Sequence, residues 1–420
     1  MEEIPVTAQR AEEPMPRLPE PMNPDQRIRI LHVITGLDLG GAERMLFNLV
    51  TRHDPDSFTP MVVSLRDTGP LGEDLKARGI PVEALGMRRG WPSLAALFRF
   101  RTILRQFRPS LIQSWMYHAN LFSLVGTGFG RSAAVIWGIH HSELPFEVNK
   151  ALTLLVNRAC ALGSHFGLAR IVCCSDSALR IHQSCGYAAS KLLVIPNGFE
   201  IDSPYDASDP GTHVPLHLEL GLSRESRIIA HVGRFHPQKD HATFFRAAAI
   251  VARQCSDVHF VLCGDGVTWG NPELVGMVEQ ANLRDRVHLL GIRRDVRKIM
   301  QASFLVASSS CGEAFPMVIG EAMSQGRPCV VTDVGDSAAM VGETGFVVSP
   351  KDPVGLAAAI IRLLTASAVD IERMGSAAFQ RIRENFQVDV VVGKYEALYR
   401  TVVQSWRAGA HPKADICSTT

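Results

Sequence analysis

The chain has 420 residues, 46% of them hydrophobic, and a formal net charge of +1. This length is enough to bury a large core and favours two domains over one. Because the charge is nearly balanced, the composition gives no support for bulk binding of nucleic acid, and we expect no nucleic-acid partner. Nine cysteines, including the adjacent Cys173 and Cys174, do not form the pattern of a disulfide framework, which favours a reducing compartment.

The first 26 residues are acidic and contain six prolines. They lack the basic start and the apolar stretch of a signal peptide, so we expect residues 1–26 to be a disordered tail. Later apolar runs are interrupted by Arg131 and several glycines, and none reaches the roughly 18 to 20 residues of a membrane-spanning helix. We therefore expect a cytoplasmic protein, or one held peripherally on the inner face of a membrane.

The sequence gives no pattern for a metal or cofactor site. No Cys-x-x-Cys pair occurs, and the fifteen histidines show no recognised metal-ligand spacing. We expect no metal and no organic cofactor.

From residue 27 the chain alternates short β-branched apolar runs with helical patterns. The apolar runs predict strands over residues 27–35, 58–65, 110–115, 133–140, 169–175 and 191–197. Helical periodicity lies between several of them, as at residues 41–53 and 93–107. This alternation is typical of a parallel, doubly wound sheet, and it predicts an N-terminal Rossmann-like domain over residues 27–195.

Turn-forming and acidic residues then interrupt the alternation, and we take residues 196–225 as a linker. A second series predicts strands over residues 226–234, 257–264, 286–291, 303–308, 327–332 and 345–349. It marks a second Rossmann-like domain over residues 226–385. A C-terminal helix over residues 386–406 is expected to pack back on the N-terminal domain, with a tail over residues 407–420. The predicted fold class is α/β, with two doubly wound parallel-sheet domains facing a central cleft, where ligands bind beyond the carboxyl ends of the strands.

The stretch "SSSCGEAFPMVIGE" holds two carboxylates, Glu313 and Glu321, with seven residues between them. Pro316 disfavours helical geometry at Phe315 and is itself tolerated at the first position of a helix. We therefore expect Glu313 in a loop and Glu321 on a helix that begins at Pro316. The two carboxylates then bracket a helix N-terminus, whose free amides and positive dipole end favour an anion, most often a phosphate.

Two further stretches at predicted strand ends favour phosphate binding. "HVGRFHPQKDH" offers Arg234 and Lys239 beside Gly233, and a guanidinium with an ammonium suits a diphosphate. Alone, this stretch is more often a solvated basic loop, but it lies at the same sheet edge as the predicted helix start. "ITGLDLGGAER" places Gly40 and Gly41 at a helix N-terminus, although it lacks the full dinucleotide-binding pattern.

Together these motifs resemble the retaining glycosyltransferases of family 4. The resemblance covers about residues 27–405 and rests on the ordered set "GLDLGGAERML", "VIPNGFE", "VGRFHPQKDHATFFRAA", "CGDG", "EAFPMVIGEAMSQGRPCVVTDVG" and "YEALYR". It implies the GT-B arrangement of two Rossmann-like domains. It also implies transfer of a sugar from a nucleotide-diphosphate sugar to a glycan, a polyprenyl-linked or another lipid acceptor with retention of configuration, in cell-surface polysaccharide or glycolipid biosynthesis.

The resemblance assigns catalytic and donor-binding roles to charged residues of the motifs. It implies that Arg234 and Lys239 grip the donor diphosphate and that Glu321 binds the ribose of the nucleotide. It implies that Glu313 contacts the hydroxyls of the donor sugar. His118 matches the family histidine that lines the donor sugar near the reacting carbon.

Other positions in the motifs are implied to bind substrate through the backbone. Phe315 and Pro316 would present backbone amides to the sugar and the phosphate, and Gly41 would approach the diphosphate from across the cleft. The remaining residues that we place in the binding set lie in the same motifs: Gly40, Gly233, Gly264 and Met317.

Neither glutamate is required to act as an acid or a base in such a transfer. A nucleoside diphosphate is already a good leaving group, so the larger need is to stabilise developing negative charge, which preorganised cations and amides can do. Two catalytic carboxylates are instead the pattern of glycoside hydrolysis. The resemblance therefore points to a metal-independent, hexosyltransferase-like enzyme.

Three alternatives share the two-domain plan. A phosphorylase would need a lysine for pyridoxal phosphate, for which the sequence gives no convincing context. An epimerase would convert a nucleotide sugar without any acceptor. A nucleotide-sugar-binding module without catalysis is disfavoured by the presence of all four charged donor-site residues.

The sequence Asp54-Pro55-Asp56 could be the metal-binding Asp-x-Asp of single-domain glycosyltransferases. It precedes a predicted strand, whereas a ligand site would follow one. We therefore interpret it as a solvated turn.

The segment from Ala84 to Ser142 contains no Asp or Glu but has seven arginines, with Trp91 among them: Arg88, Arg89, Arg99, Arg101, Arg105, Arg108 and Arg131. One interpretation is a solvated basic helix face. The other is a surface that contacts an anionic membrane or a polyprenyl diphosphate carrier. Both interpretations remain open at this point.

Overall fold

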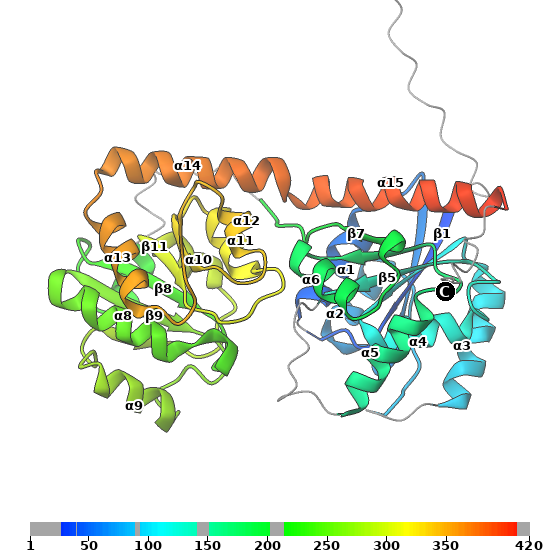
Figure 1. The fold of residues 1–420 in the computed structure, drawn as a ribbon, viewed down its shortest axis with the longest axis horizontal. Coiled ribbons are helices and arrows are strands. Elements are labelled where there is room, and N and C mark those ends of the chain that lie inside the picture. The colour runs from blue at the N-terminus through cyan, green and yellow to red at the C-terminus, as the bar shows by residue number, and fades with distance from the viewer. Residues whose placement is uncertain (1–26, 39, 89–92, 141–150, 202–213, 410–420) are drawn as a thin grey trace, which may run out of the picture.

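The computed structural model describes residues 27–38, 40–88, 93–140, 151–201 and 214–409. Within these ranges the chain forms two parallel sheets, each flanked by helices and joined side by side (Figure 1). The predicted tail over residues 1–26, most of the tail over residues 407–420, Arg89 and Trp91 lie outside the described residues.

The N-terminal sheet has the strand order β3-β2-β1-β4-β5-β6-β7, and its strand pairings are parallel. Its strands are β1 (Ile28–Ile34), β2 (Phe58–Ser64), β3 (Val82–Ala84), β4 (Leu111–Trp115), β5 (Ala134–Ile139), β6 (Arg170–Cys173) and β7 (Leu192–Val194). The six strands expected from the sequence are confirmed. The edge strand β3 was missed, because it is only three half-buried residues long and pairs with β2 alone.

Helices cover both faces of this sheet: α1 (Gly41–Arg52), α2 (Gly69–Ala77), α3 (Leu94–Phe107), α4 (Tyr117–Gly126), α5 (Ala151–Gly163) and α6 (Asp176–Ser184). Successive residues of a strand point to opposite faces, so β1 serves two cores. Ile30 and Ile34 pack in the core that contains α1, while Leu31 and Val33 pack in the core that contains α3.

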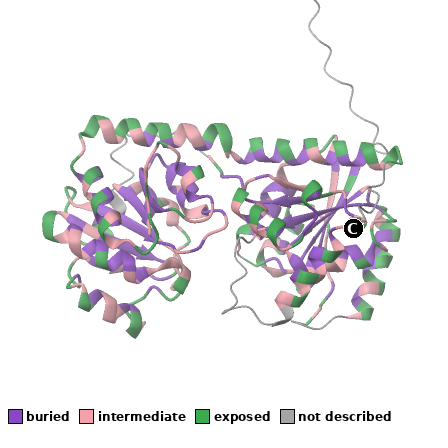
Figure 2. Ribbon diagram, viewed as in Figure 1, coloured by how far each residue is buried: buried purple, intermediate pink, exposed green. Residues whose placement is uncertain are grey.

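The C-terminal sheet has the order β10-β9-β8-β11-β12-β13, again with parallel pairings. Its strands are β8 (Arg227–Val232), β9 (Val258–Cys263), β10 (Val287–Leu289), β11 (Leu305–Ser308), β12 (Cys329–Thr332) and β13 (Phe346–Val348). All six were predicted. Figure 2 shows that the strands of both sheets are mostly buried, whereas exposed residues lie mainly on the outer helices and loops.

The helices of this half are α7 (Val214–Glu219), α8 (His241–Gln254), α9 (Pro272–Gln280), α10 (Val296–Ala302), α11 (Met317–Met323), α12 (Ser337–Val341), α13 (Pro353–Leu364) and α14 (Ala368–Asn385). Among the described helices, none alone is both long and apolar enough to cross a membrane. By length and composition, α13 and α14 pass that test only when they are joined across a bend of 112°.

The last helix, α15 (Val388–Arg407), returns to the N-terminal domain and packs beside α1 (Figure 1). Its inner face contributes Val391, Tyr395 and Tyr399 to the same core as Ile30. Side chains four positions apart lie on one face of a helix, which explains why these three residues are buried together.

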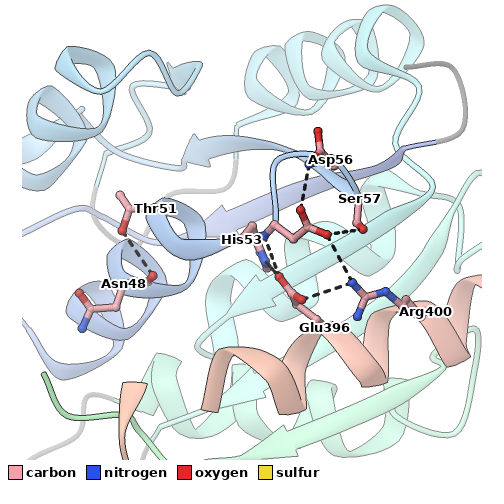
Figure 3. A network of polar contacts seen from close by, with 8 residues as sticks. Asn48, Thr51, His53, Asp56, Ser57, Glu396 and Arg400 are labelled. Atoms are coloured by element: carbon pink, nitrogen blue, oxygen red, sulfur yellow. Dashed lines mark hydrogen bonds and ion pairs between the residues drawn. The ribbon is translucent and has the colours of Figure 1, made fainter. Parts of the chain in front are cut away.

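A polar network fastens α15 to the loop before β2 (Figure 3). The carboxylate of Glu396 pairs with Nδ1 of His53 at 3.3 Å and accepts a hydrogen bond from the amide of Asp54 at 2.9 Å. Arg400, one turn farther along α15, contacts Glu396 at 3.4 Å. Burial would raise the pKa of Glu396, but the contacts with His53 and the Asp54 amide bring the pKa below its ordinary value.

The Asp-Pro-Asp sequence forms a turn, as predicted. The carboxylate of Asp54 accepts hydrogen bonds from the Ser57 hydroxyl at 2.5 Å and from the Asp56 amide at 3.0 Å. Its carboxylate is thus used to shape the entry into β2. In the described part of the chain, no group of three or more His, Cys, Asp or Glu side chains is arranged to hold a metal ion.

Two chain crossings connect the domains, and they pair with each other. The amide of Phe199 donates to the carbonyl of Phe386 at 2.8 Å, and the amide of Val388 donates to the carbonyl of Phe199 at 2.9 Å. This is a single parallel bridge between Phe199 and Gln387. The link between the domains is therefore a hydrogen-bonded pair of segments.

The anchor of α15 gives a stability prediction. Glu396 is a buried carboxylate with a backbone partner and two side-chain partners, and hydrogen bonds to charged groups contribute roughly 1.5 to 3 kcal/mol each. We expect Glu396→Ala to lower the free energy of unfolding by about 2 kcal/mol. Urea denaturation followed by circular dichroism measures it. As a control, Glu73→Ala removes an exposed ion pair with Lys76 and should cost less than about 0.5 kcal/mol. Equal losses in the two variants would contradict the assignment.

Candidate active site

Loops that follow strands of the two sheets meet between the domains. The loop after β1 leads into α1, and a Cβ atom placed on Gly41 at the start of that helix would lie 3.9 Å from Cγ of Met317. Met317 begins α11, which follows β11 in the other sheet. The amide nitrogen of the Asn197 side chain lies 3.5 Å from the sulfur of Met317. The carboxyl ends of the two sheets therefore face one common cleft.

A cavity of about 220 Å³ lies at this edge of the C-terminal sheet. It is lined by the end of β8, by the loop after β11 and by the first turn of α11, with Lys239, Glu313, Phe315, Pro316 and Met317 among its walls. Five of the residues predicted from the sequence thus surround one small space.

Lys239 and Glu313 form an ion pair in the wall of this cavity. Nζ of Lys239 lies 2.5 Å from Oε1 of Glu313, and the two side chains are 21% and 15% exposed. The hydroxyl of Ser310 donates to the same carboxylate oxygen at 2.7 Å. Glu313 is therefore oriented by a cation and a hydroxyl group before any substrate binds.

Local backbone geometry explains the position of Lys239. A short 3-10 helix, Pro237–Lys239, follows β8 and ends at Asp240, whose φ is +45°. The Asp240 carboxylate caps α8 by accepting from the amide of Thr243 at 3.1 Å. This cap reverses the chain direction and leaves Lys239 beside the strand end.

Two of the predicted glycines allow the loops after β8 and β9 to touch. Gly264 has a φ of +152°, and a Cβ there would lie 2.1 Å from the carbonyl oxygen of Gly233. A Cβ on Gly233 would itself lie 3.2 Å from the Lys239 side chain. Both glycines therefore make room for neighbouring protein atoms, and Gly233 does so directly beneath Lys239.

Arg234 follows β8 in the same loop as Lys239. It is exposed and is not among the residues that line the cavity. The structure therefore brings Lys239 and Glu313 into contact, and it leaves Arg234 at the adjacent surface.

The loop before α11 corrects two expectations. The helix begins at Met317, and Pro316 is the capping residue with ψ of +80°, so the helix starts one residue later than predicted. Proline has no N–H, so the expectation that Pro316 presents an amide to the ligand is wrong. Phe315 is 7% exposed, and its ring lies 5.9 Å from those of Phe199 and Phe386. Its side chain therefore packs against the two chain crossings.

Glu321 lies on α11 and Glu313 in the preceding loop, as the sequence predicts. Glu321 is half-buried and does not line the cavity. Burial raises the pKa of Glu321, and the charge of Arg44 on α1 partly offsets this rise. The charge of Arg44, in the other domain, therefore stabilises the ionised form of Glu321.

The predicted site residues of the N-terminal domain lie at helix starts, and none of them is among the residues that line the cavity. Gly40 caps α1, and Gly41 is its first residue. His118 is the second residue of α4, directly after the end of β4, and is half-buried. Burial lowers the pKa of His118, so its imidazole is neutral at pH 7.

The sequence analysis did not single out Ser310 or Arg44. Ser310 lies three residues before Glu313, and a Ser-x-x-Glu spacing was the available signal. Arg44 lies one helical turn after Gly40 in "GGAER", which places it near the start of the helix. Its relation to Glu321 depends on the docking of two domains, and no local pattern encodes it.

Two family models match this chain. The model for Glycosyltransferase Family 4 covers residues 39–203, and the model for Glycosyl transferases group 1 covers residues 226–366. The chain belongs to the group 1, family 4 glycosyltransferases. It is therefore a transferase that moves a sugar.

Curated relatives agree with this membership. The UDP-Gal:alpha-D-GlcNAc-diphosphoundecaprenol alpha-1,3-galactosyltransferase of Escherichia coli is 25% identical over 90% of this chain and 98% of that protein. The lipopolysaccharide core biosynthesis glycosyltransferase LpsD of Rhizobium meliloti is 23% identical over 89% of this chain and 98% of that protein.

Solved structures show the fold of this glycosyltransferase. The crystal structure of Anabaena HepE in complex with UDP has a TM-score of 0.76 at 24% identity and covers 89% of this chain and 100% of that chain. The complex of HepE with UDP-glucose has a TM-score of 0.73. The fold is GT-B, as predicted.

The shifted pKa of Glu321 gives a pH prediction. Because this pKa is raised on folding, the folded state holds the proton to a higher pH than the unfolded state does. Stability therefore falls as the pH rises through the interval between the two pKa values. We expect Glu321→Gln to be more stable than wild type at pH 7, and the difference to shrink as the pH falls to about 4.3, the ordinary pKa of glutamate. Urea denaturation at pH 7 and pH 4 tests this, and a difference that does not change with pH would contradict it.

Proposed function

We propose that this glycosyltransferase moves a sugar from a nucleotide-diphosphate sugar to a glycan or lipid-linked acceptor, with retention of configuration, in cell-surface polysaccharide or glycolipid biosynthesis. The observation that carries the proposal is the Lys239–Glu313 pair in the wall of a cavity at the carboxyl edge of the C-terminal sheet. The names of the Escherichia coli and Rhizobium relatives support the acceptor class, and the UDP complexes of HepE support the donor class.

In this proposal the charged residues divide the donor between them. Lys239 and Arg234 neutralise the diphosphate, because both are cations in the loop after β8. Glu313 accepts hydrogen bonds from hydroxyls of the sugar, and Glu321 accepts them from the ribose. The partner set is thus a nucleotide-diphosphate sugar and a glycan or polyprenyl-linked acceptor.

The proposed reaction breaks the bond between the anomeric carbon and the oxygen of the β-phosphate. The acceptor oxygen forms the new bond on the same face, and its proton passes to the departing phosphate oxygen. Negative charge grows on the diphosphate during this step, so preorganised cations lower the barrier. Lys239 and Ser310 both donate to Glu313 and fix its orientation, and His118 in the other domain is a neutral imidazole.

The alternatives are an epimerase, a phosphorylase and a binding module of the same fold. Product analysis separates them, because only a transferase yields a glycosylated acceptor together with free nucleoside diphosphate. An epimerase would convert the donor alone, and a phosphorylase would require inorganic phosphate.

The role of Lys239 gives a kinetic prediction. If Lys239 and Arg234 stabilise the leaving group without a metal, wild-type transfer should survive exhaustive EDTA treatment. We expect Lys239→Ala to lower kcat by roughly 10² to 10³, by analogy with deletion of one preorganised oxyanion donor. The exposed Lys298→Ala on α10 is the matched control and should retain wild-type kcat. Initial rates with the correct donor measure the effect. Loss of activity in EDTA that Mg²⁺ or Mn²⁺ restores, with near-normal turnover in Lys239→Ala, would contradict the mechanism.

A lipid-linked acceptor implies contact with a membrane surface, and one face of the N-terminal domain fits that contact. The helix α4 lies between α3 and α5 and packs against both. Large apolar side chains are exposed on these helices and on the loops after them: Leu94, Phe98, Val125, Phe129, Leu155, Leu162 and Phe166. The same helices and loops carry four exposed arginines: Arg101, Arg105, Arg131 and Arg158. We name these arginines and the seven apolar residues together the apolar-basic face.

The spacing of these residues supports the proposal. On α3, Leu94, Phe98, Arg101 and Arg105 recur every three or four positions and thus share the outer side of the helix. Apolar side chains with interspersed arginines match the boundary between acyl chains and anionic headgroups of a membrane. A solvated basic face would not require the exposed apolar side chains. Arg99 is used differently, because it forms an ion pair with Glu83 at 2.9 Å.

Vesicle binding tests the apolar-basic face. We expect wild type to bind vesicles that contain phosphatidylglycerol and not neutral vesicles. Each arginine near the surface contributes about 1 kcal/mol, so Arg101→Gln with Arg105→Gln should weaken binding by roughly tenfold or more. The matched control is Arg246→Gln with Arg253→Gln on α8 of the other domain, where both arginines are also exposed. Equal vesicle binding by the two double variants in flotation assays would contradict the proposal that this face binds an anionic membrane.

A further inference from the structure

One side chain of the C-terminal domain caps a helix of the N-terminal domain. Asp336 lies in the loop between β12 and α12. One of its carboxylate oxygens accepts a hydrogen bond from the backbone amide of Asp176 at 2.8 Å, and the other accepts from the amide of Ser177 at 2.9 Å. These two amides begin α6. Asp336 is only 8% exposed, so the contact is buried between the domains.

The contact is chemically matched to a helix start. The first amides of a helix have no partner within the helix, and a carboxylate is favoured there by hydrogen bonding and by the helix dipole. Ser175 already caps α6 from within the domain by accepting from the amide of Ala178 at 3.0 Å. Asp336 accepts from the two preceding amides, those of Asp176 and Ser177. These two amides have their cap only when both domains are in contact.

The same loop also contacts the loop between β11 and α11, residues 309–316, which we name the donor-binding loop after its proposed function. The amide of Asp336 donates to the carbonyl of Ala314 at 3.3 Å. Its neighbour Gly335 has a φ of +57°, and a Cβ there would lie 2.3 Å from the carbonyl oxygen of Glu313. Asp336 and Gly335 therefore lie between the first turn of α6 and the backbone of Glu313, and together they contact both.

We propose that Asp336 is a positioning residue that clasps the N-terminal domain to the donor-binding loop. Its carboxylate engages α6, and the backbone of its loop holds the segment that carries Glu313. Asp336 does not line the cavity, so it acts through Glu313 and makes no contact with substrate. The clasp sets the position of the Glu313 backbone relative to α6 of the N-terminal domain. This inference rests on the proposed function in that it takes the cleft as the active site.

Two variants separate the clasp from a general loss of stability. Asp336→Asn keeps the shape of the side chain but leaves one acceptor oxygen in place of two, and its NH₂ group faces an amide donor. Asp352→Asn removes a comparable cap inside one domain, where the Asp352 carboxylate accepts from the amide of Gly355 at 2.8 Å at the start of α13. Both variants should lower the midpoint of thermal unfolding by similar amounts.

Amide hydrogen exchange on the full chain measures directly whether the two amides that Asp336 caps are hydrogen-bonded. Amides in the first turn of a helix ordinarily exchange fast, because they lack a partner within the helix. We expect the amides of Asp176 and Ser177 to be protected in wild type, more so with UDP as the probe. Protection should be lost in Asp336→Asn and kept in Asp352→Asn. Fast exchange of both amides in wild type with UDP would overturn the clasp.

Kinetics supply the second measurement. In Asp336→Asn, kcat should fall roughly tenfold or more, since two charge-assisted hydrogen bonds are weakened, while the Kd for UDP changes less than threefold. Asp352→Asn should keep wild-type kcat. Equal losses of kcat in both variants would overturn the positioning role and leave a structural one. The exchange measurement needs no turnover, so failure of the proposed function, seen as absent transfer by wild type with every donor tried, is distinguished from failure of the clasp.

Discussion

The direction of the strands is the constraint on which this molecule depends. Because the strand pairings in each sheet are parallel, the chain leaves every strand at the same edge, and the two carboxyl edges face each other. Residues that are distant in sequence thereby meet: Lys239 after β8 pairs with Glu313 after β11, and Asp336 after β12 caps the helix that follows β6. Loops at strand ends and the first turns of the helices that follow them supply the groups of the candidate site.

The connection between the domains reaches into this site. Phe199 pairs through its backbone with the segment before α15, and its ring stacks on Phe315 of the donor-binding loop. A Cβ on Gly320 of α11 would overlap the Phe199 ring, so the crossing packs closely against the helix that carries Glu321. The connection between the domains therefore contacts the loop before α11, while Glu396 anchors α15 to the N-terminal domain.

Much of the fold could be predicted because strands of parallel sheets are buried on both faces and thus form continuous apolar runs, as in β8. The edge strand β3 has no such run. Proline favours the first helical position, yet Pro316 adopts ψ of +80° because the chain turns there to form the cavity wall. Phe315 could not be recognised as a packing residue, since its partners Phe199 and Phe386 are far away in sequence. Asp336 was missed for the same reason.

The pairing of Lys239 with Glu313 also bears on the proposed donor, which combines a sugar with a diphosphate. A lysine ammonium has three N–H donors, and Glu313 accepts from one of them, so the cation is held in place in the cavity wall. Lys239 and Ser310 donate to the same oxygen of Glu313, so a cation and a hydroxyl group together fix the direction of this carboxylate. Fixing both groups beforehand reduces the ordering that substrate binding must bring about. In the proposed function the pair is thus a preorganised junction between the phosphate side and the sugar side of the donor.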